Sequence, residues 1–94
     1  MKQKITDLTA EQVSIALSML EIERFDNADG YMKEANIGIL PSNGQWVAGT
    51  PSDGGYDIAG AGATPIEAAE MCWLGLKHGP EIDMEAVEAR GTPP

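Results

Sequence analysis

The sequence predicts an α+β fold, a two-layer sandwich in which a three-stranded antiparallel meander packs against two helices in the order α-β-β-β-α. Three observations carry this prediction. Apolar residues recur at helical spacing in an early and a late segment, short alternating runs occupy the middle, and glycine-containing turns separate those runs. Short turns favour antiparallel pairing, and a sheet with one apolar face needs helices to cover it.

The first helix is expected from Thr9 to about Glu23. Thr9 and Gln12 stand at the N-cap and N3 positions of a capping box, and Leu8 and Val13 stand at the two positions of a hydrophobic staple. Its apolar stripe, at helical spacing, consists of Val13, Ala16, Leu17 and Leu20.

Three short strands are expected next, after a loop at residues 26–30 that is rich in turn formers. The expected strands are residues 35–40, 45–49 and 56–59. Asn43 and Gly44 tolerate positive φ and predict a tight turn between the first two strands. Residues 50–55 predict a longer second loop.

The second helix has local signals at both ends. Thr64 is its predicted N-cap, Pro65 its first residue and Glu67 its N3 residue. Gly79 and Pro80 stop it. Its predicted apolar stripe is Ile66, Ala69, Trp73 and Leu76, with Cys72 beside it.

Residues 1–80 are therefore predicted to be a single α+β domain, and residues 81–94 an acidic C-terminal extension. Within the extension, Asp83 can cap a short helix that Gly91 stops. Three apolar residues would attach this helix to the body: Ile82, Met84 and Val87. Residues 91–94 are expected to fray.

Charge is the most unusual global feature, because fifteen acids face six bases and give −9 at pH 7. Such a field repels nucleic-acid phosphates and attracts basic surfaces, although net charge also serves solubility. No apolar run approaches the roughly 20 residues needed to cross a bilayer. We therefore expect neither nucleic-acid nor membrane binding. The single cysteine, Cys72, excludes an internal disulfide, and we expect a cytosolic protein.

The sequence lacks the residue sets that common catalytic and cofactor sites require. Gly60 and Gly62 precede a helix, but no P-loop lysine follows them, and Thr64 with Glu67 would satisfy the helix N-terminus instead of a phosphate. With Cys72 the sole cysteine and His78 the sole histidine, a zinc site and a Cys–His nucleophile pair are not supported. We expect no cofactor, no metal and no enzymatic activity.

Six residues are the candidate binding residues. Four belong to the acidic second half: Glu67, Glu70, Glu81 and Asp83. The other two are aromatic residues of neighbouring strands, Trp46 and Tyr56. Buried aromatics usually belong to a core, but either one becomes a binding residue if it faces away from the helices.

The segments Lys4–Val13 and Ala61–Cys72, followed by the Leu76–Gly79 stop and the acidic end, resemble small NinX-like phage proteins, which share the Leu-Thr and Thr-Pro steps into helices. The strand-to-helix segment also resembles HicB-type antitoxins, whose partners are small basic toxins. The resemblance implies a phage or prophage accessory protein of the bacterial cytoplasm.

The resulting hypothesis is a non-enzymatic protein that binds and inhibits a host protein with a basic surface, such as a nucleic-acid-binding or defence protein, as an anti-CRISPR does. Two alternatives stay open at this point: a small-molecule sponge for a nucleotide signal, and an antitoxin-like partner of a basic toxin. A homodimer is also left open.

Overall fold

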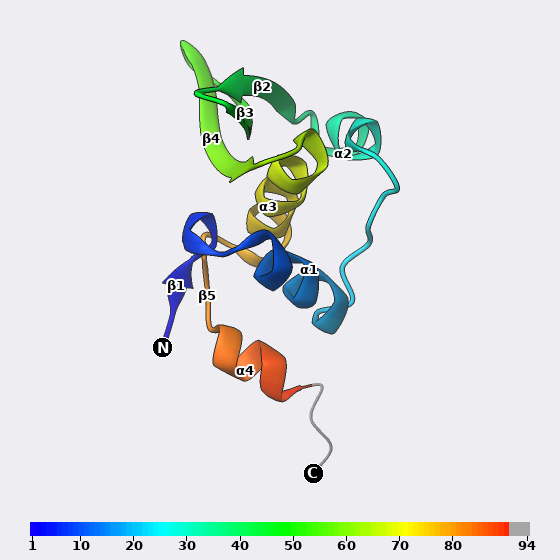
Figure 1. Ribbon diagram of the computed structural model, residues 1–94, viewed down its shortest axis with the longest axis vertical. Helices are drawn as coiled ribbons and strands as arrows, with labels where there is room; N and C mark the ends of the chain where they lie inside the picture. The colour runs from blue at the N-terminus through cyan, green and yellow to red at the C-terminus, as the bar shows by residue number, and fades with distance from the viewer. Residues whose placement is uncertain (91–94) are drawn as a thin grey trace.

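The computed structural model describes residues 1–90 and has an α+β architecture, which confirms the predicted class. The elements in chain order are β1 (Gln3–Lys4), the 3-10 helix η1 (Ile5–Asp7), α1 (Ala10–Met19), α2 (Ala28–Ala35), β2 (Gly38–Ser42), β3 (Gln45–Ser52), β4 (Gly55–Gly62), α3 (Pro65–His78), β5 (Glu81–Ile82) and α4 (Met84–Ala89). Figure 1 shows α3 between the three-stranded sheet and α1. The predicted frayed tail and the Gly91 stop lie outside the described residues.

Helix α1 begins as its sequence predicts. The Thr9 amide donates to Gln12 Oε1 at 2.9 Å, and the Gln12 amide donates to Thr9 Oγ1 at 3.1 Å, which completes the capping box. Leu8 and Val13 are both buried. The helix ends at Met19, earlier than the predicted Glu23.

Helix α2 was not predicted, and the expected loop at residues 26–30 is wrong over most of its length. Asn27 caps α2 by accepting from the Gly30 amide at 3.2 Å, and Asn36 ends it in the left-handed conformation, with φ 55°. Turn formers make good helix caps for the same reason that they make loops, since their side chains bond nearby backbone. Strand β2 consequently starts at Gly38 rather than at residue 35.

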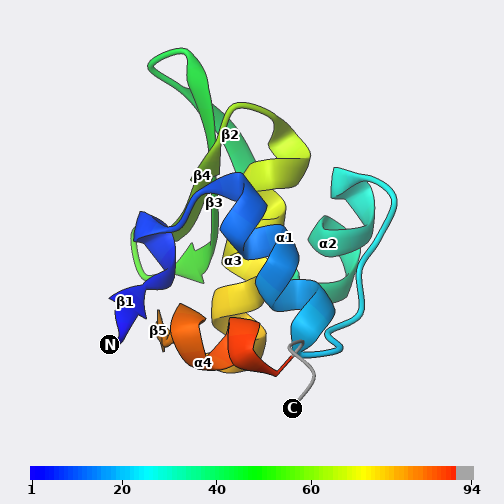
Figure 2. The ribbon, with the colours of Figure 1, turned by 60° about the horizontal axis from the view of Figure 1, so that its bottom comes forward.

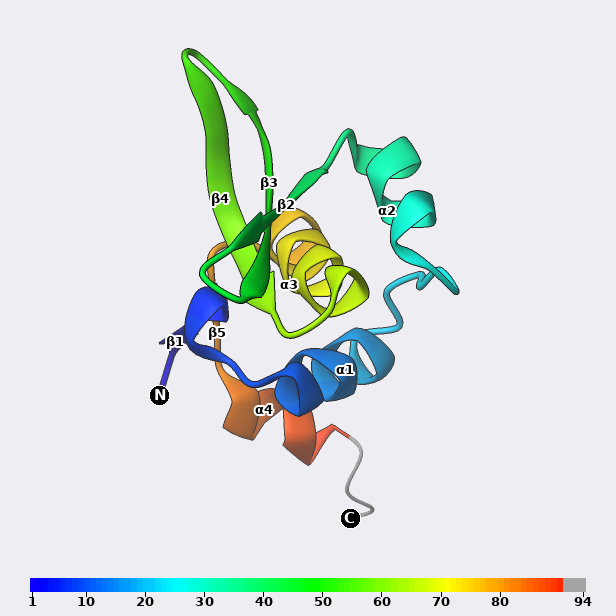
Figure 3. The ribbon, with the colours of Figure 1, turned by 45° about the horizontal axis from the view of Figure 1, so that its top comes forward.

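The sheet has the predicted meander order β2-β3-β4, and all its pairs are antiparallel. Asn43 and Gly44, with φ 49° and 80°, form the predicted tight turn. The second loop is shorter than expected, because β3 runs to Ser52 and β4 starts at Gly55. The β3–β4 hairpin therefore extends well beyond the helices (Figure 3).

The two glycines before α3 belong to strand β4 and not to a loop, which corrects the prediction of a strand ending at residue 59. A Cβ at Gly60 would meet the Ala68 carbonyl oxygen and lie 2.7 Å from the Cys72 amide nitrogen. A Cβ at Gly62 would lie 2.6 Å from the Glu67 Cβ. Glycine at these positions lets α3 lie directly against the sheet.

Helix α3 is central, with β3 and β4 on one side and α1 and α2 on the other (Figures 2 and 3). Because it is covered on two sides, its buried face is wider than the predicted stripe and includes Ala68, Met71 and Leu74 as well as Trp73. Leu76, which was expected in the core, is 49% exposed.

The segment after α3 joins the same core. Strand β5 pairs with β1, and α4 packs on α1. Asp83 caps α4, because its Oδ1 accepts from the Ala86 amide at 3.3 Å. Three buried side chains link this segment to the central cluster: Ile82, Met84 and Val87. Residues 81–90 therefore share the core of residues 1–80 instead of extending from it.

Candidate functional site

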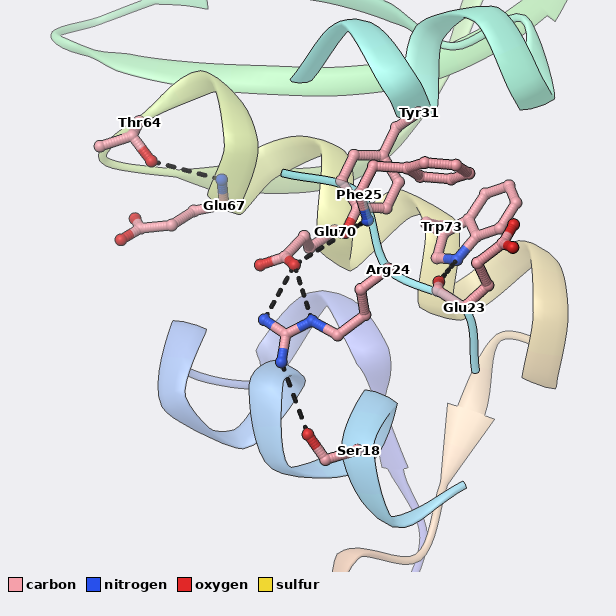
Figure 4. Close-up of polar contacts among 9 residues, drawn as sticks. All are labelled: Ser18, Glu23, Arg24, Phe25, Tyr31, Thr64, Glu67, Glu70 and Trp73. Carbon is pink, nitrogen blue, oxygen red and sulfur yellow. Dashed lines mark hydrogen bonds and ion pairs between the residues drawn. The ribbon is translucent and has the colours of Figure 1, made fainter. Parts of the chain in front are cut away.

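The carboxylate of Glu70 is already occupied within the fold. Its Oε2 accepts from Arg24 Nε at 3.1 Å, from Arg24 Nη2 at 2.9 Å and from the Tyr31 hydroxyl at 2.8 Å (Figure 4). The Glu70 side chain is only 12% exposed. A cation of a partner would have to displace Arg24, so Glu70 is a structural residue and not part of an open acidic surface.

Aromatic rings surround this ion pair on the core side. Tyr31 is fully buried, and its ring centroid lies 5.0 Å from that of Phe25 and 5.7 Å from that of Trp73, in edge-to-face arrangements. The Trp73 Nε1 donates to the Glu23 carbonyl at 2.8 Å. We call the five residues Arg24, Phe25, Tyr31, Glu70 and Trp73 the interior cluster; it joins the segment after α1 to α2 and α3.

The pKa shifts of Tyr31 and Arg24 agree with a structural role for the interior cluster. Burial raises the pKa of Tyr31, and the charge of Glu70 acts in the same direction, whereas the Phe25 amide opposes it by donating to the hydroxyl. Burial alone would lower the pKa of Arg24. The hydrogen bond from Arg24 to Glu70 and the charge of that carboxylate outweigh the effect of burial, so the pKa of Arg24 is raised. Tyr31 thus stays neutral and Arg24 charged, which suits the observed donors.

Glu67 serves the N-terminus of α3. Its amide donates to Thr64 Oγ1 at 3.3 Å (Figure 4). Its Oε2 accepts from the Ala63 amide at 3.0 Å. The chain thereby satisfies, with its own side chains, N–H groups that a bound phosphate would use.

Asp83 and Glu81 lie beyond the opposite end of α3. Asp83 caps α4, and its Oδ2 lies 3.4 Å from the Met1 amino nitrogen. Hydrogen bonding from the Ala86 amide lowers the pKa of Asp83. Glu81 is exposed and is the cross-strand partner of Lys4.

The four acids therefore do not form one surface. Glu67 lies at the start of α3 and Glu81 beyond its end, and a helix of 14 residues is about 20 Å long. Glu70 is occupied by Arg24, and Asp83 by a helix cap.

The two candidate aromatic residues, Trp46 and Tyr56, lie on opposite faces of the sheet. Trp46 pairs with Gly62, whose missing side chain would point at α3, so Trp46 lies on the covered face; it is half-buried against the core. Tyr56 is 48% exposed, and its ring lies over Gly38, with Cε1 2.6 Å from the position of a Cβ there. Leu40, two residues along β2, shares that outer face.

An exposed surface follows from this placement. Beside Leu40 and Tyr56, Ile58 is 51% exposed, and Asp53 and Asp57 are exposed on the same hairpin. Asp57 lies between Tyr56 and Ile58 on β4, so its side chain points to the opposite side of the hairpin from theirs. We call these five residues, Leu40, Asp53, Tyr56, Asp57 and Ile58, the hairpin surface, which thus includes both sides of the projecting hairpin. No lysine, arginine or histidine occurs between residues 36 and 76. Lys4 of β1, which lies near Ile58, is the cross-strand partner of Glu81.

Sequence reasoning found only Tyr56 of this surface. Asp57 and Ile58 fell within a predicted strand of four residues, whose period-2 pattern is too short to assign an outer face. Leu40 lies in the predicted strand at residues 35–40, where its exposure has no local signal. The signal that could have found them is the run of more than forty residues without a cation, combined with unusually exposed apolar positions.

Cys72 and His78 are the sole cysteine and histidine of the chain. Cys72 is fully buried, and burial raises the pKa of its thiol to about 11, which keeps it protonated at neutral pH. His78 is exposed in the last turn of α3. Within residues 1–90, no three His, Cys, Asp or Glu side chains are grouped as metal ligands. None of the helices in this range has the length and apolar character needed to cross a membrane.

Comparison of the chain with models of protein families, with curated proteins and with solved structures found no match in any of the three. The resemblance to NinX-like phage proteins and to HicB-type antitoxins stays a prediction.

Proposed function

We propose that this protein is a small, acidic, non-enzymatic binding protein whose hairpin surface docks on a basic patch of another protein. One observation carries the proposal. Tyr56, Leu40 and Ile58 are each about half exposed on a hairpin that also presents Asp53 and Asp57. Exposed aromatic and aliphatic side chains rimmed by charge are typical of protein interaction sites.

The charges of the hairpin surface favour a basic partner. Its two carboxylates have no cation within residues 36–76, and the whole chain carries −9. Complementary potentials accelerate encounter and suppress partners of like charge. A second copy of this chain would place the same carboxylates against each other, so the charge argues for a different protein.

The function that suits this chemistry is inhibition of a host protein that handles nucleic acid. A groove that binds phosphates is lined by Lys and Arg, and an acidic protein with an apolar anchor competes for it. In a phage or prophage setting, which the resemblance implies, the target would be a defence protein such as a CRISPR effector. The antitoxin-like alternative uses the same surface against a small basic toxin.

A nucleotide-binding function remains the second candidate, because the exposed ring of Tyr56 offers a stacking platform. The adjacent Asp57 and the nearby Asp53 would repel the phosphates of such a ligand. The hairpin surface therefore favours a basic protein over a nucleotide.

The test is affinity capture from a bacterial lysate with the native chain and two matched variants. Leu40→Ser and Leu76→Ser make the same change at positions that are 48% and 49% exposed, but only Leu40 belongs to the hairpin surface. We expect Leu40→Ser to lose at least ten-fold in captured partner, and Leu76→Ser to retain it.

Salt and charge variants sharpen this test. Capture should weaken from low to high salt and on Asp57→Asn, whereas Asp26→Asn, an exposed acid before α2, should leave it unchanged. Equal capture by Leu40→Ser and Leu76→Ser would exclude the hairpin surface as the docking site.

A further inference from the structure

A cavity of about 390 Å³ lies where η1, β4 and the second half of α3 meet. Its walls are mostly apolar and include Ile5, Ile58, Ala59, Gly75 and Pro80. Ligand cavities in proteins run from roughly 300 to 1,000 Å³, so this one has room for a single compact group. Figure 1 shows the elements around it, with η1 and β5 lying to one side of α3.

The walls of the cavity are held in place without an occupant. Ile5 is 2% exposed, and its amide donates to the Pro80 carbonyl at 3.0 Å. Immediately beside them, Lys4 of β1 pairs with Glu81 of β5. A hydrogen-bonded and partly buried rim of this kind is preformed, so binding there needs little reorganisation.

Gly75 leaves one side of the cavity open. A Cβ at Gly75 would have no heavy atom within 4 Å, in contrast to Gly60, where α3 backbone blocks it. Glycine weakens a helix interior relative to alanine, and packing gives no reason for it at this position. A side chain at position 75 would project into the open space that borders the cavity.

The charges at the cavity favour an uncharged occupant. Its two ionisable lining residues, Lys4 and Glu81, have opposite signs and are cross-strand neighbours. The remaining lining is apolar except for Thr6. Burying an aliphatic or aromatic group here is favourable, whereas a charged group would lose its hydration without a net opposite charge.

The cavity is continuous with the hairpin surface. Ile58 lines the cavity and is 51% exposed, so it belongs to both, and Asp57 precedes it on β4. A partner that covers the hairpin surface would therefore reach the cavity mouth. Interfaces of this kind are anchored by a few apolar side chains in pockets beside charged contacts.

We propose that this cavity receives an aliphatic or aromatic side chain of the basic protein that docks on the hairpin surface. The inference rests on the proposed function for the nature of the partner. Anchor and charge act together: the apolar side chain fills the cavity while neighbouring Lys or Arg residues of the partner meet Asp57 and Asp53.

The test uses defined probes on the isolated full chain. Acetyl-Trp-Lys-Lys-amide, acetyl-Ala-Lys-Lys-amide and free indole are titrated while amide NMR shifts are followed. We expect saturable shifts at Ile5, Ile58 and Ala59 with the Trp peptide, and at least ten-fold weaker binding of the Ala peptide, equal to about 1.4 kcal/mol or more. Indole should bind more weakly than the Trp peptide, because it lacks the lysines.

Gly75→Leu supplies the structural arm, because the new side chain starts from the cavity lining and projects into the open space beside it. Ala10→Leu is the matched control, since it adds the same side chain at an exposed position on α1. We expect at least a ten-fold loss of Trp-peptide binding in Gly75→Leu and no loss in Ala10→Leu, with both variants showing native NMR spectra.

Three results would overturn the proposal: equal binding of the Trp and Ala peptides, undiminished binding by Gly75→Leu, or indole binding as tightly as the Trp peptide, which would mark a small-molecule cavity. These outcomes are separable from failure of the proposed function. If lysate capture still depends on Leu40 while the peptides cause no shifts at the cavity residues, only the proposal that the cavity receives a side chain of the partner is wrong. If the cavity binds the Trp peptide but capture ignores Leu40, the hairpin surface fails instead.

Discussion

The two tyrosines of this chain show how differently one side chain is used in two regions. Tyr31 is 0% exposed; its hydroxyl donates to Glu70 at 2.8 Å and accepts from the Phe25 amide at 3.1 Å. Tyr56 is 48% exposed, and its ring lies over Gly38 on the outer face of the sheet. The interior cluster uses its polar groups to hold the fold, whereas the hairpin surface presents its groups to solvent.

The comparison separates two kinds of acidic residue as well. Glu70 neutralises Arg24 and is nearly buried, but Asp57 stands on a hairpin with no basic residue in the surrounding sequence. Net charge alone does not distinguish them. A carboxylate is available to a partner only where the fold leaves it without an internal cation.

The largest expected difference is between truncations of the two tyrosines. Tyr31→Ala should lower the free energy of unfolding by about 3 to 5 kcal/mol, because it removes a buried ring from the interior cluster. Tyr56→Ala should cost less than about 1 kcal/mol, since the ring is half in solvent. Urea denaturation measures both.

If Tyr31→Ala does not fold, Tyr31→Phe keeps the ring and removes only the hydroxyl. It should cost about 1 to 3 kcal/mol, because the Phe25 amide and the Glu70 carboxylate lose their shared partner. If Tyr31→Phe and Tyr56→Phe lowered the free energy of unfolding by similar amounts, the contrast between the interior cluster and the hairpin surface would be wrong.

Alkaline pH should destabilise the fold through the buried thiol of Cys72. Burial raises the pKa of Cys72 from 9.0 to about 11, so the unfolded chain loses this proton at lower pH than the folded chain. Stability is therefore fully present below pH 9 and falls between pH 9 and 11, by up to about 1.4 kcal/mol per pH unit. The raised pKa of Tyr31 adds a loss of the same sign above pH 10.

Cys72→Ala tests this assignment through the slope of stability against pH, and not through stability itself. The variant should show a shallower decline between pH 9 and 11 in denaturation curves taken at each pH. An unchanged slope would mean that the buried thiol does not control alkaline unfolding.

A smaller effect is expected from removing the charge of Glu70. Glu70→Gln should lower the free energy of unfolding by about 1 to 2 kcal/mol, because Arg24 and the Tyr31 hydroxyl lose an ionic acceptor in a site only partly shielded from water. Asp57→Asn on the hairpin surface should change it by less than about 0.5 kcal/mol. Faster amide exchange at Phe25 in Glu70→Gln alone would locate the loosened segment.

The smallest expected effect is a gain in stability instead of a loss, and it concerns Gly75, on the side of α3 that faces the cavity. Gly75→Ala should raise the free energy of unfolding by about 0.5 to 1 kcal/mol, because its Cβ meets no heavy atom within 4 Å and alanine favours the helix. Thermal or urea denaturation checks this, and a fall in stability would show that position 75 is packed after all.

Much of the architecture was readable because its signals are local. The caps of α1, α3 and α4 and the Asn43–Gly44 turn each join atoms within three residues of one another, and all were predicted at the observed positions. The α+β class followed from hydrophobic periodicity and from the turn residues between the short strands. Helix α2 was not predicted because asparagine and glycine, the residue types at positions 27 and 30, occur in helix caps as well as in loops.

Only part of the candidate site could be predicted from the sequence, because the contacts that define it join residues far apart in the chain. Glu70 looked like a surface acid because nothing near it in the sequence is basic, yet Arg24, 46 residues away, occupies it. The acidic surface made of Glu67, Glu70, Glu81 and Asp83 was therefore divided by the fold. Of the two aromatics, Tyr56 remained a binding candidate and Trp46 did not.

By itself the sequence determined where three of the four α-helices in residues 1–90 begin, where the tight turn lies, the α+β class and the large excess of negative charge, because each depends on neighbouring residues or on composition. Tertiary structure decided which charges are neutralised internally, which tyrosine is buried, and where a cavity opens beside Gly75. Those properties depend on contacts between segments tens of residues apart, whose pairing no local pattern records.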